Sequence, residues 1–232
     1  MRGVISIGNS MTLKTLNELV EKLQAQTIGE PEWIAEKNVF EYSDQSIEVV
    51  VVLKLVRAVH GLHSMDLLCQ RGLFVDMNTL WRCVYDCVAE VFFLLEKYPQ
   101  QSSNVKKFIE EFFSNTIDNF LSTEKEPAQN KKIISAYARV LSGSKQDEVV
   151  RQTISRIHRT NSGYIHASYS HIMEMFGGPS KTFNFSGIPS HDQKLIRSQI
   201  VEAAKTSVAQ TIAFAAQRFD LHDIYEDTKT YR

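Results

Sequence analysis

Apolar residues recur along most of this chain at the spacing expected of an α-helix. Only 10 glycines and 5 prolines interrupt the 232 residues, and the alternation typical of strands is almost absent. The segments with helical spacing are about 12–26, 44–70, 75–98, 104–121, 133–141, 146–176 and 192–219. We therefore predict an all-α protein, a single bundle of six to seven helices with at most one small hairpin, near residues 181–189.

The same pattern suggests one main domain with two extensions. A chain of 232 residues is long enough to bury one large core. We assign residues 43–219 to the helical bundle, 1–42 to an N-terminal arm of one short helix and a loop, and 220–232 to a polar tail that frays. The segment 75–98 is apolar nearly all round, so we expect it to be the central helix.

Charge and composition limit the classes of partner. The chain has 26 Lys and Arg against 27 Asp and Glu, a formal net charge of −1, so any contact with RNA must be local. The longest aliphatic run ends at Lys54 and is too short to cross a bilayer, and the first ten residues do not form a signal peptide. Three cysteines without a CxxC pair indicate thiols in a reducing compartment. We expect a cytoplasmic protein without a membrane partner.

One ionisable stripe crosses the apolar helix predicted at 75–98. Arg82, Asp86 and Glu90 recur there every four residues. Buried charges persist only when they are paired or face a polar site. The stripe is therefore either an internal ion pair that fixes the register of the helix or the wall of a pocket, and the sequence leaves both interpretations open.

Polar chemistry is most concentrated between residues 156 and 178, which contain three histidines and two arginines. In a helix, Ser162 and His166 lie on the same face as Arg159. Arg159 and His166 are separated by about 10.5 Å of helical rise. Because helical side chains lean toward the N-terminus, both could contact one phosphate-sized group. This face is the candidate site.

Arg82 with its acidic partners, followed by Tyr164-Ile-His166-Ala-Ser-Tyr and a Gly-Gly stop, resembles a group of bacterial all-α domains of unknown function. Those domains are similar to the HEPN superfamily, in which many members are metal-independent ribonucleases. The resemblance covers about residues 43–219. Nuclease members carry an arginine and a histidine with four to six residues between them, and Arg159 and His166 match this rule with six residues between them. Thr160 stands where those members often have an amide or acid, and Asn161 is one position late.

This resemblance implies an endoribonuclease of a bacterial defence or toxin–antitoxin type system that needs no metal or cofactor. His166 would act as acid or base, because histidine exchanges a proton near neutral pH, and Arg159 would neutralise the phosphorane charge. The groups that would line or orient the site are Arg82, Asp86, Glu90, Asn161, Ser162 and Tyr164. The resemblance also implies a homodimer that binds RNA locally.

Other interpretations of the same residues stay open, including that the protein is not an enzyme. The pairs Arg57 with His63 and Arg151 with His158 satisfy the same spacing rule. In a non-catalytic module that binds a protein or ligand, His166 would be a structural histidine and Arg159 a solvated surface cation. A third hypothesis is a metal enzyme built on His60, His63 and Asp66, at positions i, i+3 and i+6 of the helix predicted at 44–70.

Overall fold

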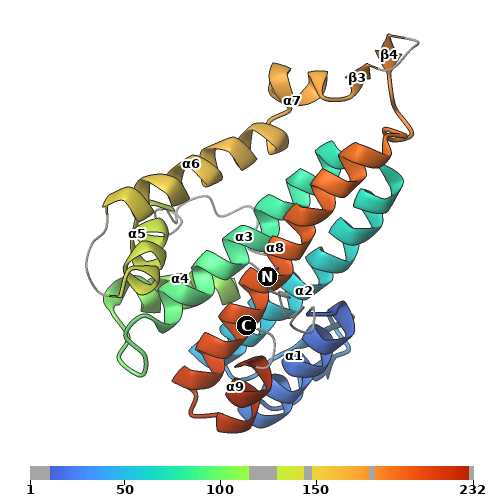
Figure 1. The fold of residues 1–232 in the computed structure, drawn as a ribbon. Helices are drawn as coiled ribbons and strands as arrows, with labels where there is room; N and C mark the ends of the chain where they lie inside the picture. Colours follow the sequence, from blue (N-terminus) through green and yellow to red (C-terminus); the bar gives the residue numbers. More distant parts are fainter. Residues whose placement is uncertain (1–10, 115–129, 144–147, 178–180, 230–232) are drawn as a thin grey trace, which may run out of the picture.

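The computed structural model describes residues 11–114, 130–143, 148–177 and 181–229 (Figure 1). Within these ranges the chain forms nine helices and two short antiparallel hairpins, so the prediction of an all-α bundle is confirmed, while the predicted number of six to seven helices was too low because the short α7 and α9 were not expected. The helices are α1 (Leu13–Thr27), α2 (Ile47–Arg71), α3 (Phe74–Leu95), α4 (Ser103–Ser114), α5 (Asn130–Leu141), α6 (Glu148–Ile165), α7 (Tyr169–Met173), α8 (His191–Arg218) and α9 (His222–Lys229). The strands are β1 (Glu32–Ile34), β2 (Val39–Glu41), β3 (Phe176–Gly177) and β4 (Thr182–Phe183).

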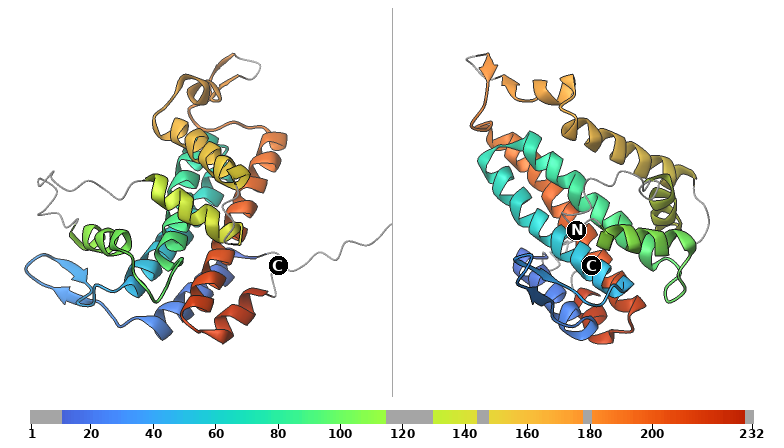
Figure 2. Two further views of the ribbon diagram at one scale, coloured as in Figure 1. Left: turned by 90° about the vertical axis from the view of Figure 1, so that its left-hand side faces the viewer. Right: turned by 180° about the vertical axis from the view of Figure 1, so that it is seen from behind.

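The long helices α2, α3 and α8 lie side by side and form the centre of the bundle (Figure 1 and Figure 2). Of the 22 residues of α3, 14 are buried, against 12 of 25 in α2, so the predicted central position of this helix is confirmed. At Gly61 a Cβ atom would lie 2.7 Å from Cγ2 of Val84, so a glycine is needed for the close approach of α2 to α3. Ala204 and Ala216 of α8 are fully buried and give that helix a narrow packing face.

Outer helices cover this centre on several sides. Both α5 and α6 pack against α3, while α4 contacts α2, and α1 packs against α2, α8 and α9. The residues Leu16 and Leu23 of α1 are fully buried, so this helix contributes to the core instead of projecting from it. No helix in the described ranges is long and apolar enough to span a membrane.

The C-terminal segment differs from its prediction. We expected residues from 220 onward to fray, but 222–229 form α9, in which Ile224 is fully buried. Polar contacts fix α9 to α1: Nζ of Lys22 lies 2.6 Å from Oδ2 of Asp227, and Nε2 of Gln26 lies 2.9 Å from Oδ2 of Asp223. The partners are about 200 residues apart in the chain, so local polarity gave no sign of this docking.

We predicted at most one hairpin, but the described residues form two. β1 pairs with β2, where the rings of Trp33 and Phe40 meet edge to face at 4.9 Å, in a segment that we took for a loop. Each of these strands has three residues, too few for a visible alternation. The second hairpin pairs Phe176 with Phe183, so its first strand lies before the predicted range of 181–189.

The predicted helix over 146–176 is interrupted after Ile165. Ala167 has a φ of 47°, and its neighbour Ser168 donates from its backbone N to the carbonyl of Gly163 at 3.0 Å, which closes α6. Gly163 itself stays helical, and its missing side chain leaves room for the ring of His171 from the following helix. The break lets α7 and the hairpin β3–β4 turn away from the line of α6 (Figure 1).

A tight turn at Gly72 connects α2 to α3 and also holds the segment after β4. Gly72 has a φ of 76°, and its carbonyl accepts a hydrogen bond from the backbone N of Ile188 at 2.9 Å. A Cβ atom at Gly72 would overlap the backbone of Ile188. Glycine is therefore required by both the left-handed conformation and the close contact.

Candidate functional site

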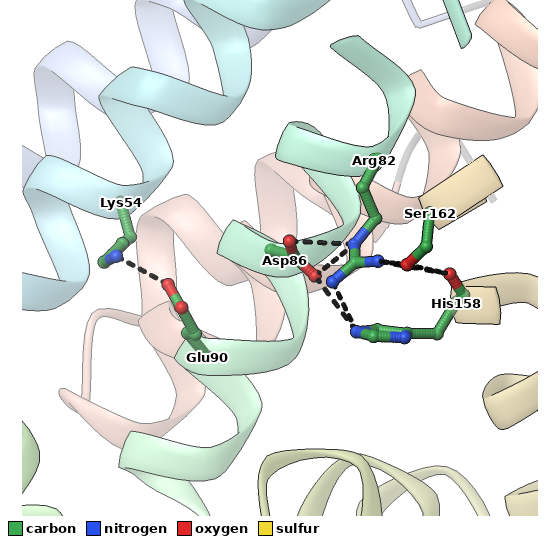
Figure 3. Close-up of polar contacts among 6 residues, drawn as sticks. All are labelled: Lys54, Arg82, Asp86, Glu90, His158 and Ser162. Atoms are coloured by element: carbon green, nitrogen blue, oxygen red, sulfur yellow. Dashed lines mark hydrogen bonds and ion pairs between the residues drawn. The ribbon is translucent and has the colours of Figure 1, made fainter. Parts of the chain in front are cut away.

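The side chain of Arg82 on α3 is the hub of a polar cluster that joins α3 to α6 (Figure 3). Its Nε donates to both carboxylate oxygens of Asp86, at 2.8 and 2.9 Å. Its Nη1 lies 3.1 Å from the backbone carbonyl of His158 and 2.5 Å from Oγ of Ser162, and its Nη2 contacts Nε2 of His158. We call these four residues the Arg82 cluster.

Hydrogen bonding fixes the charge of His158 in the Arg82 cluster. An arginine can only donate, so Nε2 of His158 accepts and the neutral ring carries its proton on Nδ1. Burial lowers the pKa of His158 and the charge of Arg82 lowers it further, while Asp86, 3.9 Å away, opposes the shift. His158 is therefore a neutral acceptor already engaged with Arg82.

Glu90 does not belong to this cluster, which corrects the predicted stripe of three residues. Its Oε2 lies 2.6 Å from Nζ of Lys54 on α2 (Figure 3). That ammonium group also lies 5.5 Å and 5.1 Å from the ring centres of Phe108 and Phe112. Burial raises the pKa of Glu90, against the effect of Lys54. Eight residues advance a helix about 80° beyond two full turns, so Glu90 faces α2 while Arg82 faces α6.

Arg159 and His166 lie apart from the Arg82 cluster. Both are exposed, and neither side chain has a hydrogen bond or ion pair with another residue in the described ranges. Ser162, which we predicted on the same face, points instead to Arg82. Ser162 is about 60° from Arg159 around the helix axis, and the sequence did not show that α3 packs on that side.

We did not predict from the sequence that His158 would be a partner of Arg82. We matched it by spacing to Arg151, but Arg151 pairs with Glu148, with N to O distances of 2.8 and 2.6 Å. The available signal was that His158 and Ser162 are four residues apart, so they share one side of α6. Their common partner is on α3 and is 76 residues before His158.

The remaining predicted residues of α6 face inward. Asn161 is buried, and its side-chain nitrogen has no hydrogen-bond partner in the described structure. The hydroxyl of Tyr164 donates to Oε1 of Glu174 at 2.7 Å, and Oε2 of Glu174 lies 2.8 Å from Nη2 of Arg197 on α8. Burial and the contact with Glu174 raise the pKa of Tyr164, so its hydroxyl keeps its proton. His171 packs edge-on against the Tyr164 ring, with 4.0 Å between ring centres.

Glu174 and Arg197 also line a pocket of about 390 Å³, which we call the flap pocket because the β3–β4 hairpin forms one side of it. The start of α3, the end of α7 and the start of α8 complete it. Its apolar lining includes Leu73, Phe74, Met173, Phe176, Ile188 and Ile196, and its other polar side chains are Asp76, Asn184 and Gln193. The turn at Gly72 thus closes α2 and shapes the pocket.

Some charged groups of the flap pocket are already paired with each other, and one is not. The guanidinium group of Arg197 lies 5.9 Å from the ring centre of Phe74, and its charge is paired with Glu174. Asp76 is exposed in the first turn of α3 and has no polar side-chain contact in the described ranges. The pocket therefore presents one unpaired carboxylate beside aromatic rings.

The described residues contain no group of three or more His, Cys, Asp or Glu side chains placed to hold a metal ion. His63 instead contacts Oδ1 of Asn17 through Nε2 at 3.0 Å, and His60 is exposed. The three cysteines are free thiols; Cys69 and Cys87 are buried, and Cys83 is half-buried. Burial raises the pKa of Cys87 to about 11, so this thiol is not poised to be a thiolate at neutral pH.

In comparisons with known proteins, no family model, no curated protein and no solved structure matches this chain. Its function must therefore be argued from the Arg82 cluster, the exposed Arg159 and His166, and the pockets.

Proposed function

We propose that this protein is a helical ligand-binding module and that the flap pocket is its binding site. The observation that carries the proposal is a pocket of about 390 Å³ in which mostly apolar side chains surround a few polar groups. Binding sites for small molecules have this volume and composition. The pocket draws on four chain segments, at 72–76, 173–176, 184–188 and 193–197, so a ligand there would tie the segments on either side of the hairpin to the bundle.

The chemistry of the lining supports a ligand with an apolar body and a protonated amine. Glu174 is already engaged by Arg197 and Tyr164, which leaves Asp76 as the carboxylate that a ligand can pair with. Phe74 offers apolar surface, and the exposed ring of Phe176 offers a favourable face for a cation. A carboxylate ligand would meet Asp76 as a like charge and is disfavoured.

The test compares two probes of similar shape, phenethylamine and 3-phenylpropionate, by ligand-observed NMR with the full chain. We expect the amine to bind and the acid to bind much more weakly. Asp76→Asn should remove this preference without changing the melting temperature, because the side chain of Asp76 is exposed. Asp192→Asn is the matched control, since Asp192 lies in the first turn of α8 and does not line the pocket. Equal binding of both probes, or binding of neither, would contradict the proposal.

A second candidate function is the metal-independent endoribonuclease implied by the resemblance to HEPN domains. The observation that favours it is that Arg159 and His166 are both exposed and uncommitted, so RNA could reach them. His166 would transfer the proton and Arg159 would neutralise the phosphorane. In this proposal the Arg82 cluster orients α6 and does not contact RNA, and a second copy related by two-fold symmetry would supply another such pair.

RNA degradation in the presence of a chelator tests this second candidate. His166→Ala should abolish cleavage and leave the melting temperature unchanged, because an exposed side chain contributes little packing. Light scattering should give the mass of a dimer. If wild type and variant degrade RNA equally, or if the protein is strictly monomeric and inactive, the ribonuclease proposal fails while the binding proposal is unaffected.

A further inference from the structure

A second pocket, of about 450 Å³, lies at the opposite end of α3 from the flap pocket. The end of α3, the turn that follows it, the start of α4 and residues along α5 from 131 to 139 surround it. Phe93, Leu94 and Val105 give it an apolar floor, and each of these residues is buried. We call it the basic pocket because of the charges around this floor.

Four cationic side chains and one carboxylate line the basic pocket, which leaves a net charge of +3 on its lining. They are Lys97, Lys131, Lys132, Arg139 and Glu96. The whole chain carries a net charge of −1, so this concentration of positive charge is local. A cavity lined by one sign of charge focuses the field on an anion of opposite sign.

The pairing of these groups leaves three lysines for a ligand. Glu96 accepts from Nε and Nη2 of Arg139, at 2.5 and 2.8 Å, so these two charges cancel. Lys132 donates to the uncharged amide oxygen of Asn104 at 2.8 Å. Lys97 and Lys131 are exposed and have no polar side-chain contact in the described part of the chain. Among the described residues, no carboxylate therefore pairs with any of the three lysines.

The start of α4 adds neutral donors to the same cavity. Ser102, Asn104 and Val105 line the pocket. The backbone N–H of Val105 already donates to the hydroxyl of Ser102 at 3.3 Å, so the donors left for a ligand are this hydroxyl and the N–H groups of Asn104. The backbone N–H groups in the first turn of a helix have no partner inside the helix, and the helix dipole favours an anion there. The lysines supply charge and α4 supplies directional hydrogen bonds, which together suit phosphate oxygens.

We propose that the basic pocket binds a small ligand through a phosphate group, with the apolar floor receiving the rest of the molecule. The volume of about 450 Å³ fits a small ligand, since such sites measure roughly 300–1,000 Å³. This site shares no residue with the flap pocket and does not depend on the function proposed for it.

Isothermal titration calorimetry of the full chain with inorganic pyrophosphate tests the proposal. We expect binding that weakens as salt is raised, because the contact is ionic. The double substitution Lys97→Gln/Lys131→Gln should weaken binding at least about tenfold, since it removes two charge-assisted contacts. Both side chains are exposed, so the variant should melt at the wild-type temperature.

The matched control is Lys14→Gln/Lys106→Gln, which makes the same change in net charge. Lys106 is on α4 but does not line the basic pocket, and Lys14 is on α1. This control should bind pyrophosphate as wild type does. The proposal is overturned if pyrophosphate does not bind or if both double variants lose the same affinity. It is also overturned if a single-stranded RNA dodecamer binds far more tightly than pyrophosphate through Lys97 and Lys131, because the occupant would then be a nucleic acid.

Discussion

Replacing Arg82 with methionine should destabilise the protein by separating α3 from α6. Methionine keeps an unbranched apolar side chain where the stem of Arg82 is buried but removes every hydrogen bond that the guanidinium group makes. The change leaves Asp86 without its cation, and Nε2 of His158 and Oγ of Ser162 lose a donor. The bonds from Arg82 to His158 and Ser162 are the hydrogen bonds that join α3 to α6 in the described ranges.

The size of the effect depends on how far each group that loses its partner is exposed to water. Removing one partner of a fully buried ion pair costs about 3–5 kcal/mol. Asp86 is 39% exposed and can regain water, and the carbonyl of His158 keeps the hydrogen bond from Ser162 at 3.0 Å. We therefore expect a loss of about 2–3 kcal/mol in the free energy of unfolding, which is roughly 4–12 °C in melting temperature for a chain of this length.

Urea unfolding followed by circular dichroism, with a thermal melt, measures this loss. Arg151→Met is the control, because Arg151 forms an exposed pair with Glu148 on α6 and should leave the transition unchanged. The double variant Arg82→Met/Asp86→Ala should lose less than the sum of its single variants, since it strands no charge. If Arg82→Met unfolds within about 0.5 kcal/mol of wild type, the cluster does not hold α6 to α3.

Three further predictions concern single residues. Folding lowers the pKa of His158 below 6.5, so the wild type should lose stability as the pH falls through 6.5. In His158→Gln, whose side chain does not titrate, the urea midpoint should change less between pH 5 and 7. Gly72→Ala should reduce the melting temperature far more than Gly143→Ala. Both glycines have a positive φ, but only at Gly72 would the added Cβ overlap backbone atoms. Equal losses of melting temperature would exclude a steric role of Gly72. Lys54→Met should raise the pKa of Glu90 further above 4.5. The variant should therefore lose more unfolding free energy at pH 8 than at pH 5. An equal loss at both pH values would mean that Glu90 is not buried with Lys54.

The sequence alone determined where most helices lie and which is central. The apolar period of 3.6 residues is a local property, and the residues from 74 to 95 are apolar around most of the helix circumference, so α3 could only be an inner helix. Gly72 ends α2 by capping chemistry that is equally local, whereas the N-cap of α2 is Ser46, two residues after the predicted start at 44. The ends of α6 and the strands β1 and β2 escaped prediction because a few residues carry too little periodicity.

Only the tertiary structure decided which partner each ionisable residue has. Arg82 and Glu90 lie on one helix, yet Arg82 binds His158 of α6 and Glu90 binds Lys54 of α2. The flap pocket likewise combines Gly72 with Arg197, 125 residues later. A helical pattern fixes the angle between side chains on one helix, but their partners depend on how each helix is rotated and packed against its neighbours. That rotation is set by the burial of apolar surface over the whole bundle, which no short stretch of sequence specifies.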